Sequence, residues 1–217
     1  MPGHTLPARP RRTNVYIDSW NLYYGCLKKS PNKWINVAEM VRRSMPSTYQ
    51  INHIRVFTAR AKARPADPQG PVRQEMFFRA LQTIPNLTMH YGNFLVSRPM
   101  MRLVTPLADG TEYLPVIKTE EKGSDVNLAT YLLVDGFKGE YEAAVVVSDD
   151  SDLVEPIKVV RQELQLHVTV LSPRGKSREL SSIATRFRRI EEAVLRASQF
   201  PSTLVDVNGI FMKPPAW

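Results

Sequence analysis

The sequence predicts an α/β fold, a three-layer α/β/α sandwich built around a mainly parallel central sheet. Segments with a strand pattern alternate with segments of helical apolar spacing along most of the 217 residues. This alternation is typical of βαβ units, which place helices on both faces of a parallel sheet. The stretch "EAAVVVS" is almost continuously apolar, the pattern of a strand covered on both faces. The length favours a single domain with a substantial core.

The first half of the chain contains three expected strands separated by helices. Residues 14–18 form a short strand that ends on Asp18, and "WNLYYGCLKK" continues as a helix. Apolar spacing predicts helices over 37–45 and 72–84, the second stopped by Pro85, and strands over 51–59 and 87–94. Residues 97–122 read as a hairpin excursion whose turn is Asp109-Gly110.

The second half continues the alternation. A helix is expected over 124–137. Its apolar face is formed by Val126, Ala129, Leu132, Leu133 and Phe137. A buried strand follows at 142–148, then a helix over 153–164, a strand over 165–172 and a mainly helical or mixed segment to residue 200. We therefore expect a flexible basic arm at 1–13, the domain at 14–200 and an irregular tail at 201–217.

Composition points to a soluble protein that meets polyanions. The only cysteine, Cys26, excludes an internal disulfide and fits a reducing cytoplasm. No apolar run approaches the roughly 18 residues that a membrane span needs, and the N-terminus has no secretory signal. With 29 Lys and Arg against 21 Asp and Glu, the formal charge is +8, and the sequence pI is near 9.7. Nucleic acid is the first partner that such a balance suggests.

Carboxylates follow two of the expected strands. Asp18 ends the first strand, Asp150 and Asp152 come just after the apolar strand, and Asp125 stands at a helix start. Ligands of such sheets bind beyond the carboxyl ends of the strands, where these side chains should meet. Clustered carboxylates repel unless a cation joins them, and an oxygen-only set favours Mg²⁺ or Mn²⁺. Such a site suits hydrolysis of a phosphodiester.

Each carboxylate also has a purely structural interpretation. Asp125 fits an N-cap or first-turn residue, and Asp152 with Glu155 resembles a capping box. Asp18 fits a strand-to-helix turn. Asp149 fits either an outer carboxylate of the site or a side chain that points to solvent, and the second is favoured slightly.

Three motifs in order, "VYIDSWNLYYG", "EKGSDVNLATYLL" and "AAVVVSDDSDLVEPIKVVRQEL", resemble the NYN domains of the PIN-like nuclease superfamily, and most closely the LabA-like branch. The resemblance covers about residues 14–172. It implies a flavodoxin-like sandwich and a metal-dependent ribonuclease site. Matched singly, the motifs assign the catalytic and metal-binding roles to Asp18, Asp125, Asp150 and Asp152, with Asn21 in support. Position 149 more often carries Gly or Asn in NYN domains, so Asp149 departs from the family pattern. Ser19 and Trp20 stand where Gly-Phe is commoner.

Basic residues at alternating positions could line a path for the phosphate chain of RNA. The candidates follow strands or precede Asp125: Arg60, Lys62, Arg64, Lys118, Lys122, Arg174 and Lys176. A solvated loop explains the first set equally well. Three aromatic residues follow Asp18: Trp20, Tyr23 and Tyr24. We expect their rings to pack in the core rather than to stack on a base.

The resulting hypothesis is a cytoplasmic metal-dependent ribonuclease. The main alternative is a non-catalytic RNA-binding or adaptor module of the same fold. A small-molecule phosphohydrolase is disfavoured because Trp20 stands where the usual type has a second aspartate. The sequence leaves the oligomeric state open, a homodimer included.

Overall fold

A seven-stranded sheet forms the centre of the protein in the computed structural model, which describes residues 9–63 and 65–217. Its strand order is β6-β3-β2-β1-β7-β8-β9. The strands are β1 (Arg11–Asp18), β2 (Tyr49–Ala59), β3 (Leu87–Ser97), β6 (Lys118–Lys122), β7 (Ala143–Val147), β8 (His167–Ser172) and β9 (Arg186–Arg189). All neighbouring strands are parallel except β3 and β6. The predicted α/β sandwich is confirmed.

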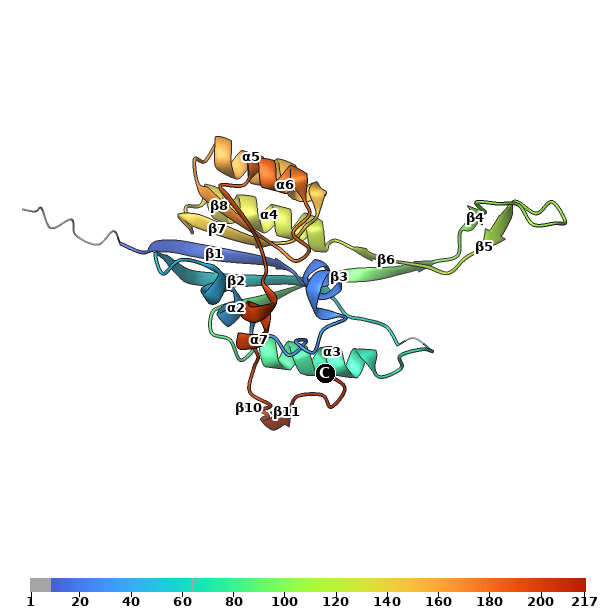
Figure 1. Cartoon of the computed structure of the whole chain (residues 1–217), viewed down its shortest axis with the longest axis horizontal. Helices are drawn as coiled ribbons and strands as arrows, with labels where there is room; N and C mark the ends of the chain where they lie inside the picture. The colour runs from blue at the N-terminus through green and yellow to red at the C-terminus, as the bar shows by residue number, and fades with distance from the viewer. Residues whose placement is uncertain (1–8, 64) are drawn as a thin grey trace, which may run out of the picture.

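Helices cover both faces of the sheet (Figure 1). One layer holds α4 (Ser124–Phe137), α5 (Val154–Gln162) and α6 (Arg178–Ile183), and the other holds α2 (Val37–Ser44), α3 (Gly70–Leu81) and α7 (Glu192–Ala197). A short helix α1 (Ser19–Leu22) runs into a π-helical turn over Tyr23–Leu27, and a 3₁₀ turn over Ser151–Leu153 precedes α5. Within the described residues, none of these helices has the length and apolarity needed to cross a bilayer.

The core is split by the sheet, because successive side chains of a strand point to opposite faces. On β1, Val15 and Ile17 belong to the cluster that α2 and α3 cover, whereas Tyr16 belongs to the cluster under α4 and α5. Strand β7 is buried at all five positions, as its continuous apolar run predicts.

A buried ion pair joins α4 to the sheet. Arg55 of β2 donates to both carboxylate oxygens of Asp135, at 2.8 and 3.0 Å, and the Tyr16 hydroxyl donates to the same carboxylate at 2.8 Å. Asp135 is only 2% exposed. The pair lies on the side of α4 that also buries Leu128 and Leu132 against the sheet.

The expected apolar face of α4 is confirmed at its centre and wrong at its ends. Leu132 is buried, and Ala129 and Leu133 pack against the same core cluster. Val126 and Phe137 are 69% and 65% exposed, whereas Leu128 and Asp135 are buried.

The ends of the domain also differ from expectation. Strand β1 begins at Arg11, inside the expected arm, while residues 1–8 of that arm lie outside the described residues, as does Arg64. The mixed segment contains the additional strand β9. In the tail, β10 (Thr203–Asp206) and β11 (Gly209–Met212) form an antiparallel hairpin, so the expectation of an irregular tail is wrong for these residues.

The tail is ordered because it docks on the domain. Arg79 of α3 donates to both oxygens of Asp206 at 2.7 Å, and Trp34 Nε1 donates to the Pro201 carbonyl at 2.9 Å. The rings of Trp34 and Trp217 meet edge to face, with centroids 6.3 Å apart.

Candidate metal centre

Parallel register brings the acidic residues to one edge of the sheet. Strand β1 pairs with β2 on one side and with β7 on the other, and Ile17 lies opposite Val147. Asp18 and the residues after Val147 therefore leave the sheet side by side. The chain order of the strands reverses between β1 and β7, which is where ligands of such sheets commonly bind.

Three of the four predicted carboxylates meet. Asp18, Asp125 and Asp150 each offer a carboxylate oxygen, and these oxygens all lie within 4.8 Å of one another. Asp152 is outside this group and exposed on the 3₁₀ turn. Oxygen donors at this separation fit a hard divalent cation such as Mg²⁺ or Mn²⁺.

Two of these carboxylates are hard to ionise without a cation. Burial, together with the charges of Asp150 and Glu121, raises the pKa of Asp18 to about 6, against hydrogen bonds from Asn21 and Ser148. Burial and four neighbouring carboxylates, Asp18 first, raise the pKa of Asp125 to about 7. A dication between them would offset both effects.

Local hydrogen bonds hold the ligands in place. Asp18 caps α1 by accepting from the Asn21 N–H at 2.9 Å. The buried Ser148 hydroxyl donates to Asp18 at 3.0 Å and accepts from the Asp150 N–H at 3.0 Å. Asp150 in turn caps the 3₁₀ turn by accepting from the Asp152 N–H at 3.0 Å. Capping and ligand geometry therefore coexist in the same side chains.

One structural interpretation is confirmed and one is wrong. The N-cap of α4 is Gly123, which has φ +98°, so of the two roles expected for Asp125 the first-turn role is confirmed and the cap is not. No side chain caps α5, whose N-cap is Leu153, so Asp152 and Glu155 form no capping box.

Asp149 points neither to the cation site nor to solvent. Its carboxylate accepts from the Ser172 hydroxyl and, at 2.7 Å, from the Arg174 N–H. Its own N–H donates to Asn21 Oδ1 at 3.2 Å. Asp149 thus ties the loop after β8 to the turn that carries Asp150, and Asn21 supports Asp149 as well as Asp18.

Glu121 and Ser148 are the site residues that sequence reasoning missed. The Glu121 carboxylate accepts from Ser124 Oγ at 2.8 Å and from the Ser124 N–H at 3.2 Å, at the start of α4. Gly92 makes room for it, since a Cβ there would lie 2.1 Å from Glu121 Oε1. The available signals were an acidic residue at the end of the strand before Asp125 and a serine directly before the aspartate pair.

The basic candidates separate into two groups. Lys118 and Lys122 both pair with Glu120, at 3.0 and 3.5 Å. Because strand residues alternate, these three side chains lie on the face of β6 opposite Glu121. Glu120 thus offsets part of the charge of both lysines, and contact of Lys122 with a phosphate stays a prediction.

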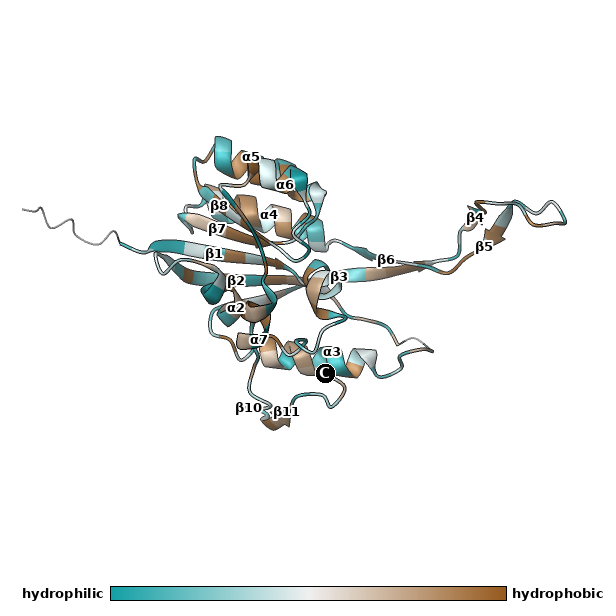
Figure 2. Ribbon diagram, in the orientation of Figure 1, coloured by the Kyte–Doolittle hydropathy of each residue, from teal (hydrophilic) through white to brown (hydrophobic). Residues whose placement is uncertain are grey.

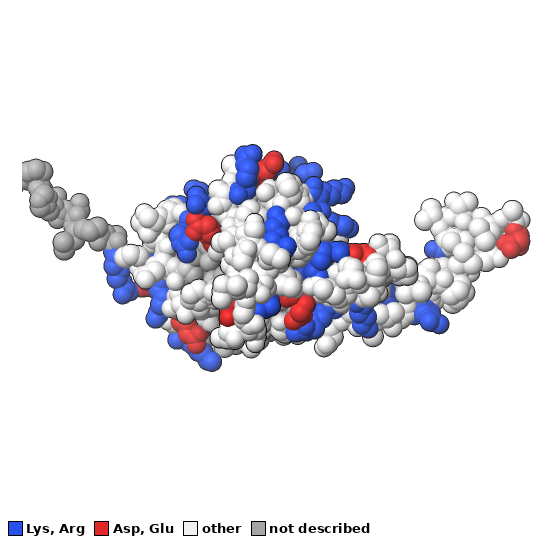
Figure 3. Space-filling model, turned by 90° about the horizontal axis from the view of Figure 1, so that it is seen from below, with Lys and Arg blue, Asp and Glu red and all other residues white. Residues whose placement is uncertain are grey.

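The other cations follow parallel strands and so lie toward the carboxyl edge. Lys62, Arg174 and Lys176 are exposed. Arg60 forms an ion pair with Glu75 and lies 4.9 Å from the centre of the Tyr91 ring. Figure 3 shows scattered cations on the face of the body that it presents.

Trp20 and Tyr24 lie at the surface close to Asp18 in sequence. Their rings are stacked, with centroids 5.7 Å apart, and Phe94 of β3 meets Trp20 edge to face at 5.6 Å. Tyr24 is 44% exposed, and Trp20 is half-buried. The expected core packing is confirmed for Tyr23, which packs against the core cluster. It is less complete for Tyr24, because that residue is exposed.

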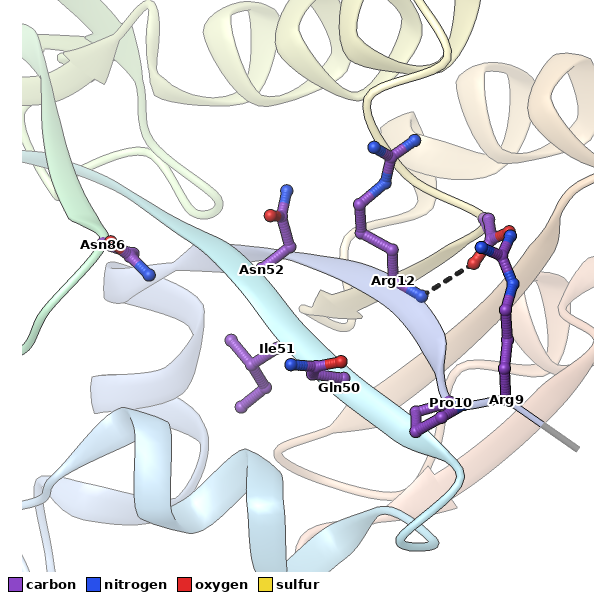
Figure 4. A pocket seen from close by; sticks show the side chains of 8 residues that line it. Arg9, Pro10, Arg12, Gln50, Ile51, Asn52 and Asn86 are labelled. Carbon is purple, nitrogen blue, oxygen red and sulfur yellow. Dashed lines mark hydrogen bonds and ion pairs between the residues drawn. The ribbon is translucent and has the colours of Figure 1, made fainter. Parts of the chain in front are cut away.

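A hollow of about 520 Å³ lies at the opposite, amino-terminal edge of the sheet (Figure 4). Arg9 and Arg12 line it together with Asn52 and Asn86. The Arg12 N–H donates to the Glu142 carboxylate at 2.9 Å, and Arg9 pairs with the same carboxylate. It is separate from the acidic cluster because the two lie at opposite ends of the strands.

Comparison with known proteins shows the family and the fold of this chain. The chain is 26% identical over 98% of its length to 6-hydroxy-3-succinoylpyridine 3-monooxygenase HspA of Pseudomonas putida (strain DSM 28022 / S16), covering 77% of that protein. A crystal structure of a protein of unknown function from Vibrio parahaemolyticus RIMD 2210633 has the same fold, with a TM-score of 0.56 and 16% identity over 86% of this chain and 97% of that one. The NYN domain model matches residues 12–191. This chain therefore belongs to the NYN domain family, which has a PIN-like nuclease fold.

Proposed function

We propose that the protein is a metal-dependent ribonuclease of the LabA-like branch, acting in the cytoplasm. The observation that carries the proposal is the convergence of oxygens from Asp18, Asp125 and Asp150 within 4.8 Å. These side chains come from three separate segments of the chain, and two of them have pKa values raised to about 6 and about 7. Family membership and the charge of +8 support a nucleic-acid substrate.

Asp18, Asp125 and Asp150 would hold Mg²⁺ or Mn²⁺. When bound, such an ion lowers the pKa of a coordinated water and stabilises negative charge on a phosphodiester. Ser148 and the Asn21 N–H fix the orientation of Asp18. From the exposed rim, Asp152 would hydrogen bond to water at the mouth of the site. Lys62, Arg174 and Lys176 would bind phosphates on either side of it.

Cleavage assays test this proposal directly. Labelled single-stranded and structured RNAs are incubated with the protein in Mg²⁺, Mn²⁺ or EDTA. We expect cleavage that requires the metal, that falls at least a hundredfold in Asp150→Asn, and that is unchanged in Asp109→Asn, a matched substitution on an exposed turn. Cleavage by Asp150→Asn at the wild-type rate would refute the catalytic assignment.

The same assays separate the adaptor alternative. A non-catalytic module would bind RNA with the same affinity before and after Asp150→Asn and would show no metal-stimulated cleavage. A filter-binding measurement on both proteins therefore decides between turnover and binding alone.

A second candidate function comes from the name of the Pseudomonas relative, monooxygenation of 6-hydroxy-3-succinoylpyridine at position 3. The specific observation in its favour is the stacked pair Trp20 and Tyr24, which offers an aromatic surface shortly after Asp18. Monooxygenation consumes dioxygen and two electrons. Oxygen uptake in the presence of 6-hydroxy-3-succinoylpyridine and a reduced nicotinamide would support it, and an absence of uptake together with RNA cleavage would exclude it.

A further inference from the structure

The end of β3 and the chain that follows it up to β6 form an arm that extends far from the body (Figure 1). We use "the arm" for residues 95–117, which contain the short strands β4 (Met100–Arg102) and β5 (Tyr113–Pro115). Backbone hydrogen bonds such as Leu103 N–H to Glu112 O at 2.8 Å and Val116 N–H to Pro99 O at 3.1 Å make it a formed hairpin.

The arm exposes an apolar surface that its own fold cannot bury. Its exposed large apolar residues are Leu95, Val96, Met100, Met101, Val104, Leu107, Tyr113, Leu114 and Ile117. Figure 2 shows much of this region in the hydrophobic colour. Among the described residues, β4 and β5 contact mainly each other. An isolated two-stranded hairpin is marginally stable in water, so the arm needs a surface to pack on.

The size of the apolar surface allows a protein interface. Weighting the nine side chains by their exposure gives on the order of 1,000 Å² per arm, spread over both faces, since strand neighbours such as Met100 and Met101 point to opposite faces. Two arms that pack through one face each would bury on the order of 1,000 Å², the lower end of the range for specific interfaces.

The charge of the arm favours a second copy of this chain, and not a polyanion, as its partner. Residues 95–117 contain two arginines and two acidic residues, so their net charge is zero on a chain of +8. Arg102 is also paired with Glu112 within the arm, at 3.4 Å. Two bodies of this charge repel each other, whereas the neutral, apolar arms do not. Figure 3 shows most of the arm without charged side chains.

The root of the arm is built differently. Strand β6 carries Lys118, Glu120 and Lys122 at the open edge of the main sheet. Lysines on an edge strand disfavour pairing with another edge. Contact between copies is thus directed to the distal hairpin and away from the sheet edge.

We propose that the arm is a dimerisation element, in which the apolar side chains of one arm pack against the arm of a second copy across a two-fold axis. A closed, isologous contact of this kind uses the same patch on both chains. It needs no catalytic activity, so its test is independent of the proposed ribonuclease function.

The test is the molar mass of the full chain in solution, measured by light scattering after size exclusion. Wild type is expected at twice the mass of the 24.7 kDa chain. The double variant Val104→Asp with Ile117→Asp is expected at the mass of one chain. Its matched control is Val207→Asp with Ile210→Asp in the tail hairpin, where the exposures of 100% and 73% resemble the 105% and 74% of the arm pair.

Circular dichroism checks that both double variants remain folded, which we expect because the substituted side chains are exposed. A monomeric wild type at micromolar concentration would overturn the proposal and leave the arm to a different partner. A dimer that survives the arm substitutions would overturn it too, as would a dimer lost equally in the tail control.

Discussion

Replacing Asp18 by Asn should stabilise the metal-free protein at neutral pH. The Asp18 carboxyl is 5% exposed, and burial with the charges of Asp150 and Glu121 raises its pKa from 3.8 to about 6. The folded state therefore binds more protons than the unfolded state between these two values. The free energy of unfolding falls as the pH rises through this window.

The magnitude follows from the two pKa values. At about 1.4 kcal/mol for each pH unit between 3.8 and about 6, ionised Asp18 costs about 3 kcal/mol. Asparagine keeps an oxygen for the Asn21 N–H and remains a good N-cap, but it loses the charged acceptor of the Ser148 hydroxyl, at about 1 kcal/mol. The expected net gain is about 2 kcal/mol, present above pH 6 and absent below pH 4.

Urea unfolding in EDTA measures this difference, with wild type and Asp18→Asn compared at about pH 8 and about pH 4. Asp109→Asn serves as the control for removing an exposed carboxylate and should change stability little at either pH. If Asp18→Asn is no more stable than wild type at the higher pH, or gains equally at both, the electrostatic account of the site is wrong.

Three further predictions concern the cation, a glycine and the buried ion pair. Mg²⁺ or Mn²⁺ should raise the Tm of wild type, EDTA should reverse the rise, and the Tm of Asp150→Asn should stay unchanged. A thermal scan in which both proteins shift equally would contradict the ligand set. Gly92→Ala should lower the free energy of unfolding by about 1–3 kcal/mol, because its Cβ would lie 2.1 Å from Glu121 Oε1, and an unchanged urea midpoint would count against this contact. Arg55→Met should lower the free energy of unfolding by about 3–5 kcal/mol, because it leaves Asp135 buried without its cation. Asp135→Leu in the same chain should restore only part of this, because the buried Tyr16 hydroxyl then loses its acceptor, at about 1–3 kcal/mol. A urea midpoint that the second change lowers further would show that the pair itself stabilises the fold.

Sequence reasoning succeeded where the signal is local. The apolar run at 143–147 is buried on both faces, and the Asp109-Gly110 turn forms with Gly110 at φ +85°. Asp18 and Asp150 end neighbouring strands as expected, because parallel strands of one sheet share their carboxyl edge. Strand and helix patterns have periods of two and 3.6 residues, so the sequence alone determined most element types between residues 14 and 172 and the edge that carries the acidic residues. It did not find β9 or the tail hairpin.

Tertiary structure decided which side chains meet at that edge. Asp125 joins Asp18 and Asp150, whereas Asp152 stays on the exposed rim and Asp149 binds the loop after β8. These outcomes depend on the rotation of each helix and the register of each strand, which are set by partners distant in the sequence. Asp135 shows the reason: its contact with Arg55 across the core buries a charged residue of α4, which apolar periodicity alone does not predict.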